Sequence, residues 1–274
     1  MNIVGLGQCG CNIAEKFNQY PQYEVYLFDS EKRDSKNFRL LKEHKTHKDY
    51  EENFPKYKFK PKHDETIFIC ATSGTITGAS LRLLHHFKKT EIRLVMIIPD
   101  QDEMLETYAL QHKLIFNALQ DYARSGMLKD VVLISNEILE ETIPNLTFLN
   151  KYDKINEVIS YSLHTINIFE NTKPVSKTKI DHKDHCRILS LGSYDYKINK
   201  ENMYFSLDNV VESVYYISIP QKTLEEDFEL VKIIKDNFKE KNSSSYQVYS
   251  NNADYDYGIV VKRTHFHQGQ KYED

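Results

Sequence analysis

Apolar residues along the chain gather in short runs that alternate with longer stretches of helical spacing. The runs are rich in Val, Ile and Phe and are too short for helices, so they predict buried β-strands. The predicted strands lie at residues 2–6, 23–28, 66–71, 92–98 and 131–135. Because strands that alternate with helices form parallel sheets covered on both faces, we expect an α/β fold with a mostly parallel, Rossmann-like first sheet.

The pattern changes beyond residue 150. Apolar residues at helical spacing over 150–170 predict one long helix with a buried stripe. A second helix is expected at 223–240, because Thr223 and Glu226 form a capping-box pattern. Strands are predicted around this second helix at residues 213–219, 245–249 and 258–264. The Lys- and His-rich stretch from His44 to His63 is interpreted as a long loop.

These patterns predict three parts of the chain. Residues 1–150 form a nucleotide-binding lobe, 151–178 the central helix and its connection, and 179–274 a smaller α+β lobe. Ligands of parallel sheets bind at the carboxyl ends of the strands, so the loops that begin at Gly5, Asp29, Ala71, Pro99 and Asn136 should share one rim.

Composition narrows the class of protein. Hydrophobic residues make up 40% of the chain and charged residues 28%, which indicates a folded globular protein. The formal net charge of -4 argues against a general nucleic-acid coat protein. No run approaches the roughly 20 apolar residues of a membrane helix, so no membrane segment is expected. Four cysteines are too few for a disulfide framework, and we expect a cytoplasmic location.

Cysteine and histidine spacing predicts no metal site. Cys9 and Cys11 have no suitably spaced partner and are interpreted as small packing residues. His265 and His267 would share one strand face near the end of the chain, where imidazoles are more often exposed than ligating.

The first candidate ligand site is the turn Gly5-Leu6-Gly7-Gln8-Cys9-Gly10, which follows a predicted strand and precedes a predicted helix over Cys11 to Phe17. Glycines at such a turn let phosphate oxygens approach main-chain N–H groups at the positive end of a helix. With Asp29 at the end of the next strand, the turn also fits a dinucleotide fingerprint. An NAD(P)- or FAD-dependent oxidoreductase is therefore an alternative.

A second turn of similar chemistry distinguishes these alternatives. Thr72-Ser73-Gly74-Thr75-Ile76-Thr77-Gly78-Ala79 follows the strand at 66–71 and precedes a predicted helix from Ser80 to Lys88. Small hydroxyl residues and glycines here provide another nest of donors for phosphate. Two such turns favour a triphosphate, since a dinucleotide fold ordinarily needs only one.

The two turns carry a resemblance to a known family. Gly7-Gln8-Cys9-Gly10 resembles the Gly-Gln-Cys-Gly loop of the tubulin family, and Gly74-Thr75-Ile76-Thr77-Gly78 is similar to its Gly-Thr-Gly-Ser/Thr-Gly phosphate signature. Ile76 replaces a glycine of that signature, and Thr72 and Ser73 replace the glycines before it. The added Cβ atoms indicate a reshaped loop and slower turnover.

The resemblance implies a guanine nucleotide, GTP or GDP, with Mg²⁺. Tyr152 and Asn156 match the aromatic residue that stacks on guanine and the amide that reads its edge in this family. Asn12 matches the asparagine of the first loop, Glu103 the ribose-contacting acid, and Asn136 an asparagine near the base. The nucleotide-contacting residues expected from the resemblance are Gly7, Gln8, Cys9, Gly10, Asn12, Ser73, Gly74, Thr75, Ile76, Thr77, Gly78, Glu103, Asn136, Tyr152 and Asn156.

The catalytic residues implied by the resemblance are Asp181 and Asp184. The segment from Lys179 to Asp184 is similar to the Asn-x-Asp-x-x-Asp loop of FtsZ, with Lys179 in place of the asparagine. In that family the loop reaches the γ-phosphate of a neighbouring subunit, so assembly completes the active site. The resemblance thus implies a GTPase that forms head-to-tail filaments of the small phage or plasmid kind.

Two further questions are left open by the sequence. A nucleotide-bound scaffold that assembles without turnover is a second alternative to the filament-forming GTPase. A DNA- or capsid-linked adaptor is the partner class considered besides a second copy of the chain, and the cargo is not defined by the sequence.

Overall fold

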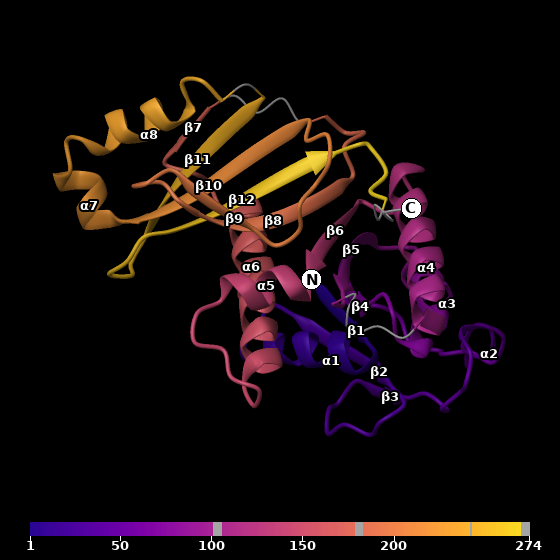
Figure 1. The fold of residues 1–274 in the computed structure, drawn as a ribbon. Helices are drawn as coiled ribbons and strands as arrows, with labels where there is room; N and C mark the ends of the chain where they lie inside the picture. Colours follow the sequence, from indigo (N-terminus) through magenta and orange to yellow (C-terminus); the bar gives the residue numbers. More distant parts are fainter. Residues whose placement is uncertain (101–105, 179–182, 242, 270–274) are drawn as a thin grey trace. The chain divides into compact units, whose positions relative to one another are not determined.

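The computed structural model describes residues 1–100, 106–178, 183–241 and 243–269. The chain divides into two compact units, one formed by Met1–Ser160 with His267–Asp274 and the other by Tyr161–Phe266 (Figure 1). The division falls inside the long helix α6 (Lys151–Glu170). Within the described residues, no helix is long and apolar enough to cross a membrane.

The first unit is built on a parallel sheet, which confirms the α/β prediction. Its strands pair in the order β3-β2-β1-β4-β5-β6, and every pairing is parallel. The strands are β1 (Asn2–Leu6), β2 (Glu24–Asp29), β3 (Phe38–Leu40), β4 (Glu65–Ala71), β5 (Glu91–Ile98) and β6 (Asp130–Ser135). The chain order reverses between β1 and β4, which makes this pair the switch point where ligands of open α/β sheets bind.

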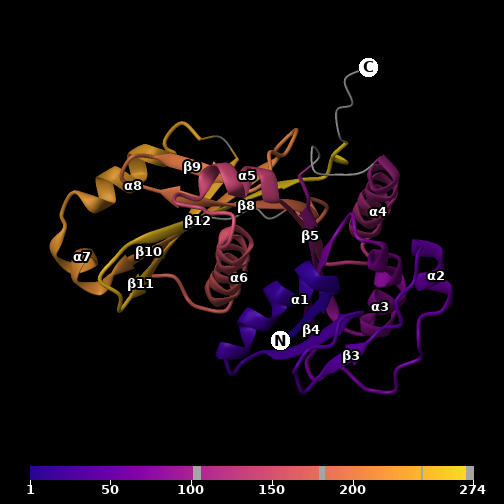
Figure 2. The same ribbon diagram turned by 60° about the horizontal axis from the view of Figure 1, so that its bottom comes forward.

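Helices cover both faces of this sheet. Helix α1 lies on one side of the central strands, whereas α3 and α4 lie on the other (Figures 1 and 2). The strands β1, β4, β5 and β6 are buried almost along their whole length, because each face meets a helix. The helices of this unit are α1 (Gly7–Glu15), α2 (His47–Glu52), α3 (Ser80–Phe87), α4 (Glu106–Arg124) and α5 (Asn136–Thr142), with the 3₁₀ turns η1 (Lys16–Gln19) and η2 (Thr75–Ala79).

Helix α1 packs on the strands without intervening side chains. A Cβ at Gly10 would stand 2.3 Å from the carbonyl oxygen of Ile69 in β4, and one at Gly5 would stand 2.6 Å from the carbonyl oxygen of Gly10. The prediction that this helix begins at Cys11 is wrong, because Gly7-Gln8-Cys9-Gly10 already forms its first turn. The backbone of α1 therefore lies directly against the switch point.

The Lys- and His-rich stretch is only partly a loop. Helix α2 interrupts it, and the Thr46 side chain caps this helix by accepting a hydrogen bond from the Asp49 N–H. Helix α2 packs tightly on η2, since a Cβ at Gly78 would stand 2.1 Å from the carbonyl oxygen of His47. Farther on, Phe59 stacks on Tyr26 of β2 at 5.2 Å between ring centroids. The aromatic residues of the Lys- and His-rich stretch thus attach it to the first sheet.

The second unit is a mixed sheet with helices on both faces. Its strands are β7 (Ser176–Lys177), β8 (Ile188–Asp195), β9 (Lys200–Met203), β10 (Glu212–Pro220), β11 (Ser244–Asn251) and β12 (Tyr257–Thr264), joined in the order β9-β8-β12-β10-β11-β7. Only β10 and β11 pair in parallel among them. Tyr215 and Ile217 share a core with Leu230 and Ile234 of α8 (Leu230–Phe238), whereas Tyr216 stacks on Phe169 of α6.

Two predictions for this unit need correction. The helix expected at 223–240 is two helices, α7 (Gln221–Glu226) and α8, which are separated at Asp227. Thr223 lies inside α7, which begins after Pro220, and therefore does not cap a helix. The strands β7, β8 and β9 were not predicted, whereas the long helix at 150–170 and the strands β10, β11 and β12 are confirmed.

The close packing of α1 predicts that Gly10→Ala destabilises the protein. The added methyl group meets the Ile69 carbonyl, and overpacking of this kind costs about 1–3 kcal/mol, so we expect the melting temperature to fall by at least about 2 °C. Gly74→Ala is the matched control, because its Cβ would have only the Ile76 Cγ2 at 3.8 Å. Thermal melts followed by circular dichroism test this, and equal melting temperatures for the two variants would contradict it.

Candidate functional site

The two glycine turns meet at the switch point of the first sheet. One turn follows β1 and the other follows β4, and β1 pairs with β4 in parallel. Gly7 has φ of 72°, and a Cβ there would stand 2.7 Å from the Cγ2 of Ile76. The Ile76 side chain therefore lies directly over the first turn. This confirms that the two turns share one rim.

Both helices that follow these turns begin without a side-chain cap. The N-cap of α1 is Leu6, and that of η2, which leads into α3, is Gly74; neither position has a capping side-chain hydrogen bond, and the first turn of α1 has no acidic residue. In contrast, α2 and α5 are capped by Thr46 and Ser135. Uncapped N–H groups and the positive helix end attract anions, and both features occur where phosphate binding was predicted.

The hydroxyl groups of the second turn differ in their surroundings. The Thr72 hydroxyl is buried, where it donates to the Ile97 carbonyl at 3.3 Å and lies 2.6 Å from Nδ1 of His112. Burial lowers the pKa of His112 to about 4, so this imidazole is neutral at pH 7. In the described part of the chain, by contrast, no hydrogen bond forms to the hydroxyls of Ser73 and Thr75, which leaves both available to a ligand.

A cavity of about 370 Å³ lies between α1 and the start of α6, inside the first unit. Three of its lining residues were expected to contact the nucleotide: Asn12 from the first loop, and Tyr152 and Asn156 at the guanine base. Tyr152 is 50% exposed, whereas Asn156 is only 7% exposed, and no hydrogen bond to the Asn156 amide forms among the described residues. The structure thus brings a half-exposed aromatic ring, with Lys151 Nζ 4.9 Å from its centroid, and a buried amide to the same cavity.

Two ion pairs hold the walls of this cavity. Lys16 Nζ lies 2.7 Å from Asp153 Oδ1 and so ties the end of α1 to α6. Lys151 Nζ lies 2.9 Å from Glu140 and ties the start of α6 to α5. Ion pairs thus connect the elements on either side of the cavity.

Arg33 is the main site residue that the sequence analysis missed. Its guanidinium donates to Asn12 Oδ1 at 2.8 Å and to the Gln8 carbonyl at 3.3 Å, and it pairs with Glu15 and Asp29 at 3.1 and 2.9 Å. Because Asn12 Oδ1 accepts from Arg33, the Asn12 NH₂ group is directed to other partners. Arg33 thereby orients Asn12 and fastens the first turn to the end of β2.

The same contacts affect the oxidoreductase alternative. The Asp29 Oδ1 accepts from the Ser30 N–H at 2.8 Å, and Oδ2 accepts from Arg33 Nε at 3.0 Å. A ribose hydroxyl would have to compete with both donors for this buried carboxylate. The arrangement therefore disfavours a dinucleotide held through Asp29.

Asn136 begins α5 at the carboxyl end of β6, on the same rim as the turns. Its Oδ1 is buried and has no hydrogen-bond partner in the described ranges. A buried acceptor without a donor is costly, so this oxygen is suited to a donor from a ligand or from water.

The remaining nucleotide-contacting and catalytic residues predicted from the sequence have different surroundings, and two of them lie outside the described residues. Gln8 is exposed and Cys9 half-buried on α1, while Thr77 is buried and bonded to the Gly74 carbonyl. Glu103 and Asp181 lie outside the described residues. Asp184 is exposed and belongs to the second unit, where its carbonyl accepts from Arg187 Nε at 3.0 Å.

The Cys11 thiol packs inside the first unit and is chemically unreactive. The Cys11 thiol is buried and donates to the Gly5 and Phe28 carbonyls at 3.4 and 3.5 Å. Burial raises the pKa of Cys11 to about 12, so the thiol is neutral and a poor nucleophile.

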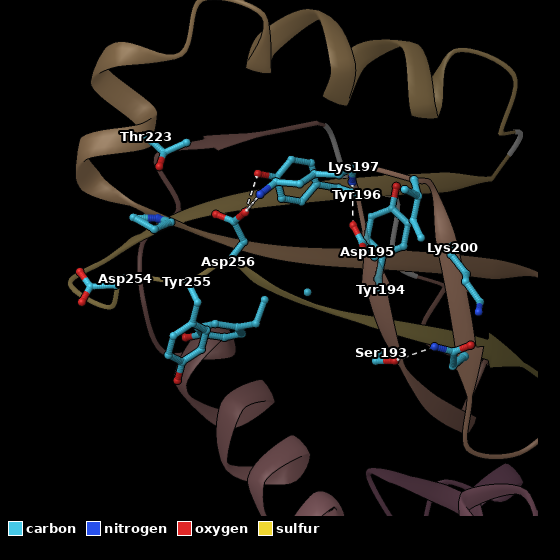
Figure 3. A pocket seen from close by; sticks show the side chains of 15 residues that line it. Ser193, Tyr194, Asp195, Tyr196, Lys197, Lys200, Thr223, Asp254, Tyr255 and Asp256 are labelled. Atoms are coloured by element: carbon cyan, nitrogen blue, oxygen red, sulfur yellow. Dashed lines mark hydrogen bonds and ion pairs between the residues drawn. The ribbon is translucent and has the colours of Figure 1, made fainter. Parts of the chain in front are cut away.

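A second cavity, of about 770 Å³, lies within the second unit (Figure 3). Tyr196 donates to Asp256 at 3.1 Å on its wall, and Lys197 pairs with the same carboxylate. None of the nucleotide-site residues predicted from the sequence lines it. The described residues that were predicted to contact the nucleotide all belong to the first unit.

Three solved structures have the same fold. An empty FtsZ dimer of M. jannaschii is 14% identical, has a TM-score of 0.64 and covers 96% of this chain and 87% of that one. A GTPγS-form protofilament of TubZ from Bacillus thuringiensis serovar israelensis is 14% identical, has a TM-score of 0.69 and covers 96% and 86%. CetZ from Methanosaeta thermophila is 13% identical, has a TM-score of 0.68 and covers 97% and 86%.

No protein-family model matches the sequence, and no curated protein matches it either. The likeness is therefore one of structure, and it extends over nearly the entire chain. The parallel first sheet with its two glycine turns, the long helix and the mixed second sheet together make up the fold that this chain shares with the FtsZ, TubZ and CetZ structures.

Proposed function

We propose that the chain binds GTP with Mg²⁺ in the first unit, assembles head to tail and hydrolyses the nucleotide at the junction between subunits. The observation that carries the proposal is the convergence of Asn12, Tyr152 and Asn156 on one cavity, beside two uncapped helix ends at the switch point. The fold is shared with FtsZ, TubZ and CetZ, of which TubZ has been seen in a GTPγS-form protofilament.

The cavity chemistry supports guanine over adenine. The Asn156 amide can donate to the guanine O6 and accept from the N1 or N2 hydrogens. Adenine does not offer the same acceptor and donors. The exposed Tyr152 ring offers a stacking surface. The Asn12 NH₂ group, oriented by Arg33, adds a further donor.

The phosphates would bind at the two turns. Main-chain N–H groups at the start of α1 and of η2 supply donors, and the hydroxyls of Ser73 and Thr75 add two more. Ile76 lies over Gly7 between these groups, so its side chain would have to move aside for a phosphate. This displacement supports a slower exchange of nucleotide than bare glycine loops allow.

Hydrolysis would depend on acids of a neighbouring subunit. Asp184 is exposed and makes no ion pair within the ranges that the structure describes, so its carboxylate is available to another molecule. With Asp181 it would orient the attacking water while main-chain donors take up charge on the phosphates. A scaffold that assembles without turnover is the alternative if these acids do not act.

The base-reading proposal predicts that Asn156→Leu weakens GTP binding by about 10- to 100-fold, because a hydrogen-bonded base edge loses its partner. Affinity for ATP should change little. Displacement of a fluorescent GTP analogue by GTP, ATP and NADH measures this, with the exposed Asn18→Leu as the control. Tighter displacement by NADH than by GTP would favour the oxidoreductase instead.

The hydrolysis proposal predicts that Asp181→Ala and Asp184→Ala each form GTP-dependent filaments but release phosphate at least about 100-fold more slowly. Light scattering and phosphate release are recorded in the same sample. Asp236→Ala, which alters an exposed acid on α8, should behave as the unaltered protein. If the unaltered protein assembles with GTP and releases no phosphate, the scaffold reading replaces hydrolysis.

A further inference from the structure

A cluster of metal-ligating side chains lies in the second unit, where β8 begins beside the end of β12. These strands are antiparallel with Ile188 opposite Thr264, so the residues just before β8 meet those just after β12. His185 and Cys186 stand on the first segment and His265 on the second. Cys186 is fixed by a turn in which its N–H donates to the Lys183 carbonyl at 2.8 Å.

The three side chains already have nearly the spacing of a metal site. Cys186 Sγ lies 3.9 Å from His265 Nδ1, and one ligand atom from each of the three residues lies within 4.8 Å of the others. Zinc bonds of about 2.3 Å to sulfur and 2.0–2.1 Å to nitrogen place tetrahedral ligand atoms roughly 3.3–3.6 Å apart. Side-chain rotations that move these atoms by about 1 Å would bring all three to the separations that zinc requires.

The burial of the three residues suits a site with one open side. Cys186 is 1% exposed, His265 is half-buried, and His185 is exposed. The rings of His185 and His265 approach to 5.2 Å between centroids at an angle of 62° between planes, so both imidazoles border the same space. The cluster thus combines a buried thiol with one imidazole that is exposed to solvent.

The surroundings hold charges of both signs. Glu212 is buried and accepts from the Lys183 N–H at 3.2 Å. Burial, followed by the charge of Glu212, raises the pKa of Cys186, while Lys183 and Arg263 act in the opposite direction. Metal binding requires the thiolate form of cysteine, so an ion bound here would release the thiol proton.

We propose that His185, Cys186 and His265 bind one divalent transition metal ion of the zinc class, with water in the fourth position. Two imidazole nitrogens and one thiolate are ligands typical of Zn²⁺, whereas Mg²⁺ and Ca²⁺ prefer oxygen. The ion would join the start of β8 to the end of β12 directly after the segment that contains Asp184. The metal site does not depend on the proposed GTPase activity.

Cobalt binding tests the site without reference to nucleotide. Protein without a polyhistidine tag is freed of metal with a chelator and titrated with Co²⁺. We expect one equivalent to bind, with the visible bands of a four-coordinate site and a thiolate-to-cobalt charge-transfer band in the near ultraviolet. Added Zn²⁺ should abolish these bands, because thiolate ligands favour Zn²⁺ and this d¹⁰ ion has no such visible bands.

Substitutions identify the ligands. Cys186→Ser should remove the charge-transfer band, and His185→Ala and His265→Ala should each weaken Co²⁺ binding at least about 10-fold. His185 is exposed, so its substitution keeps the test valid even if the buried Cys186→Ser variant folds poorly. His267→Ala and Cys9→Ser are the matched controls, since neither belongs to the cluster.

Two outcomes would overturn the proposal. One is the absence of a charge-transfer band in the unaltered protein at one equivalent of Co²⁺. The other is weak binding of several ions that the His185, Cys186 and His265 variants leave unchanged, which would indicate an adventitious metal only. Nucleotide binding, measured separately, could succeed or fail in either case.

Discussion

The direct contact between the backbone of α1 and the strands β1 and β4 is the constraint on which the first unit depends. Gly5 and Gly10 leave no side chain between helix and sheet, and a single Cβ at either position would overlap a carbonyl oxygen. The contact sets the start of α1 at the carboxyl end of β1, where the order of the sheet reverses. Both the position of the first turn and the wall that carries Asn12 follow from it.

Much of this fold could be predicted because its strongest signals are local. The strands of the first sheet are buried on both faces, so each appears as a continuous apolar run, and the stripe on α6 repeats at helical spacing. Strand β8 was missed because Ser, Gly and Tyr interrupt its apolar pattern. The break between α7 and α8 was missed because charged residues at Asp227 and Glu229 fit a helix surface as well as a loop.

The candidate site was harder to predict, because its residues meet through contacts between elements that are far apart in the sequence. Asn12, Tyr152 and Asn156 were found through a family resemblance, and they line one cavity although more than a hundred residues separate Asn12 from the others. Arg33 was missed because its role depends on contacts with Gln8 and Glu15 of another element. Cys186 and His265 likewise meet only through the pairing of β8 with β12, which no spacing in the sequence reveals.

The position of Ile76 also matters for the packing of η2 on α2. Ile76 belongs to the short η2 segment, and two residues later Gly78 is pressed against the carbonyl of His47 with no room for even a methyl group. Helix α2 therefore packs directly on the segment whose Ile76 side chain covers Gly7. The lysine-rich stretch that follows α2 is thus connected, through one short helix, to the turn that carries Ile76.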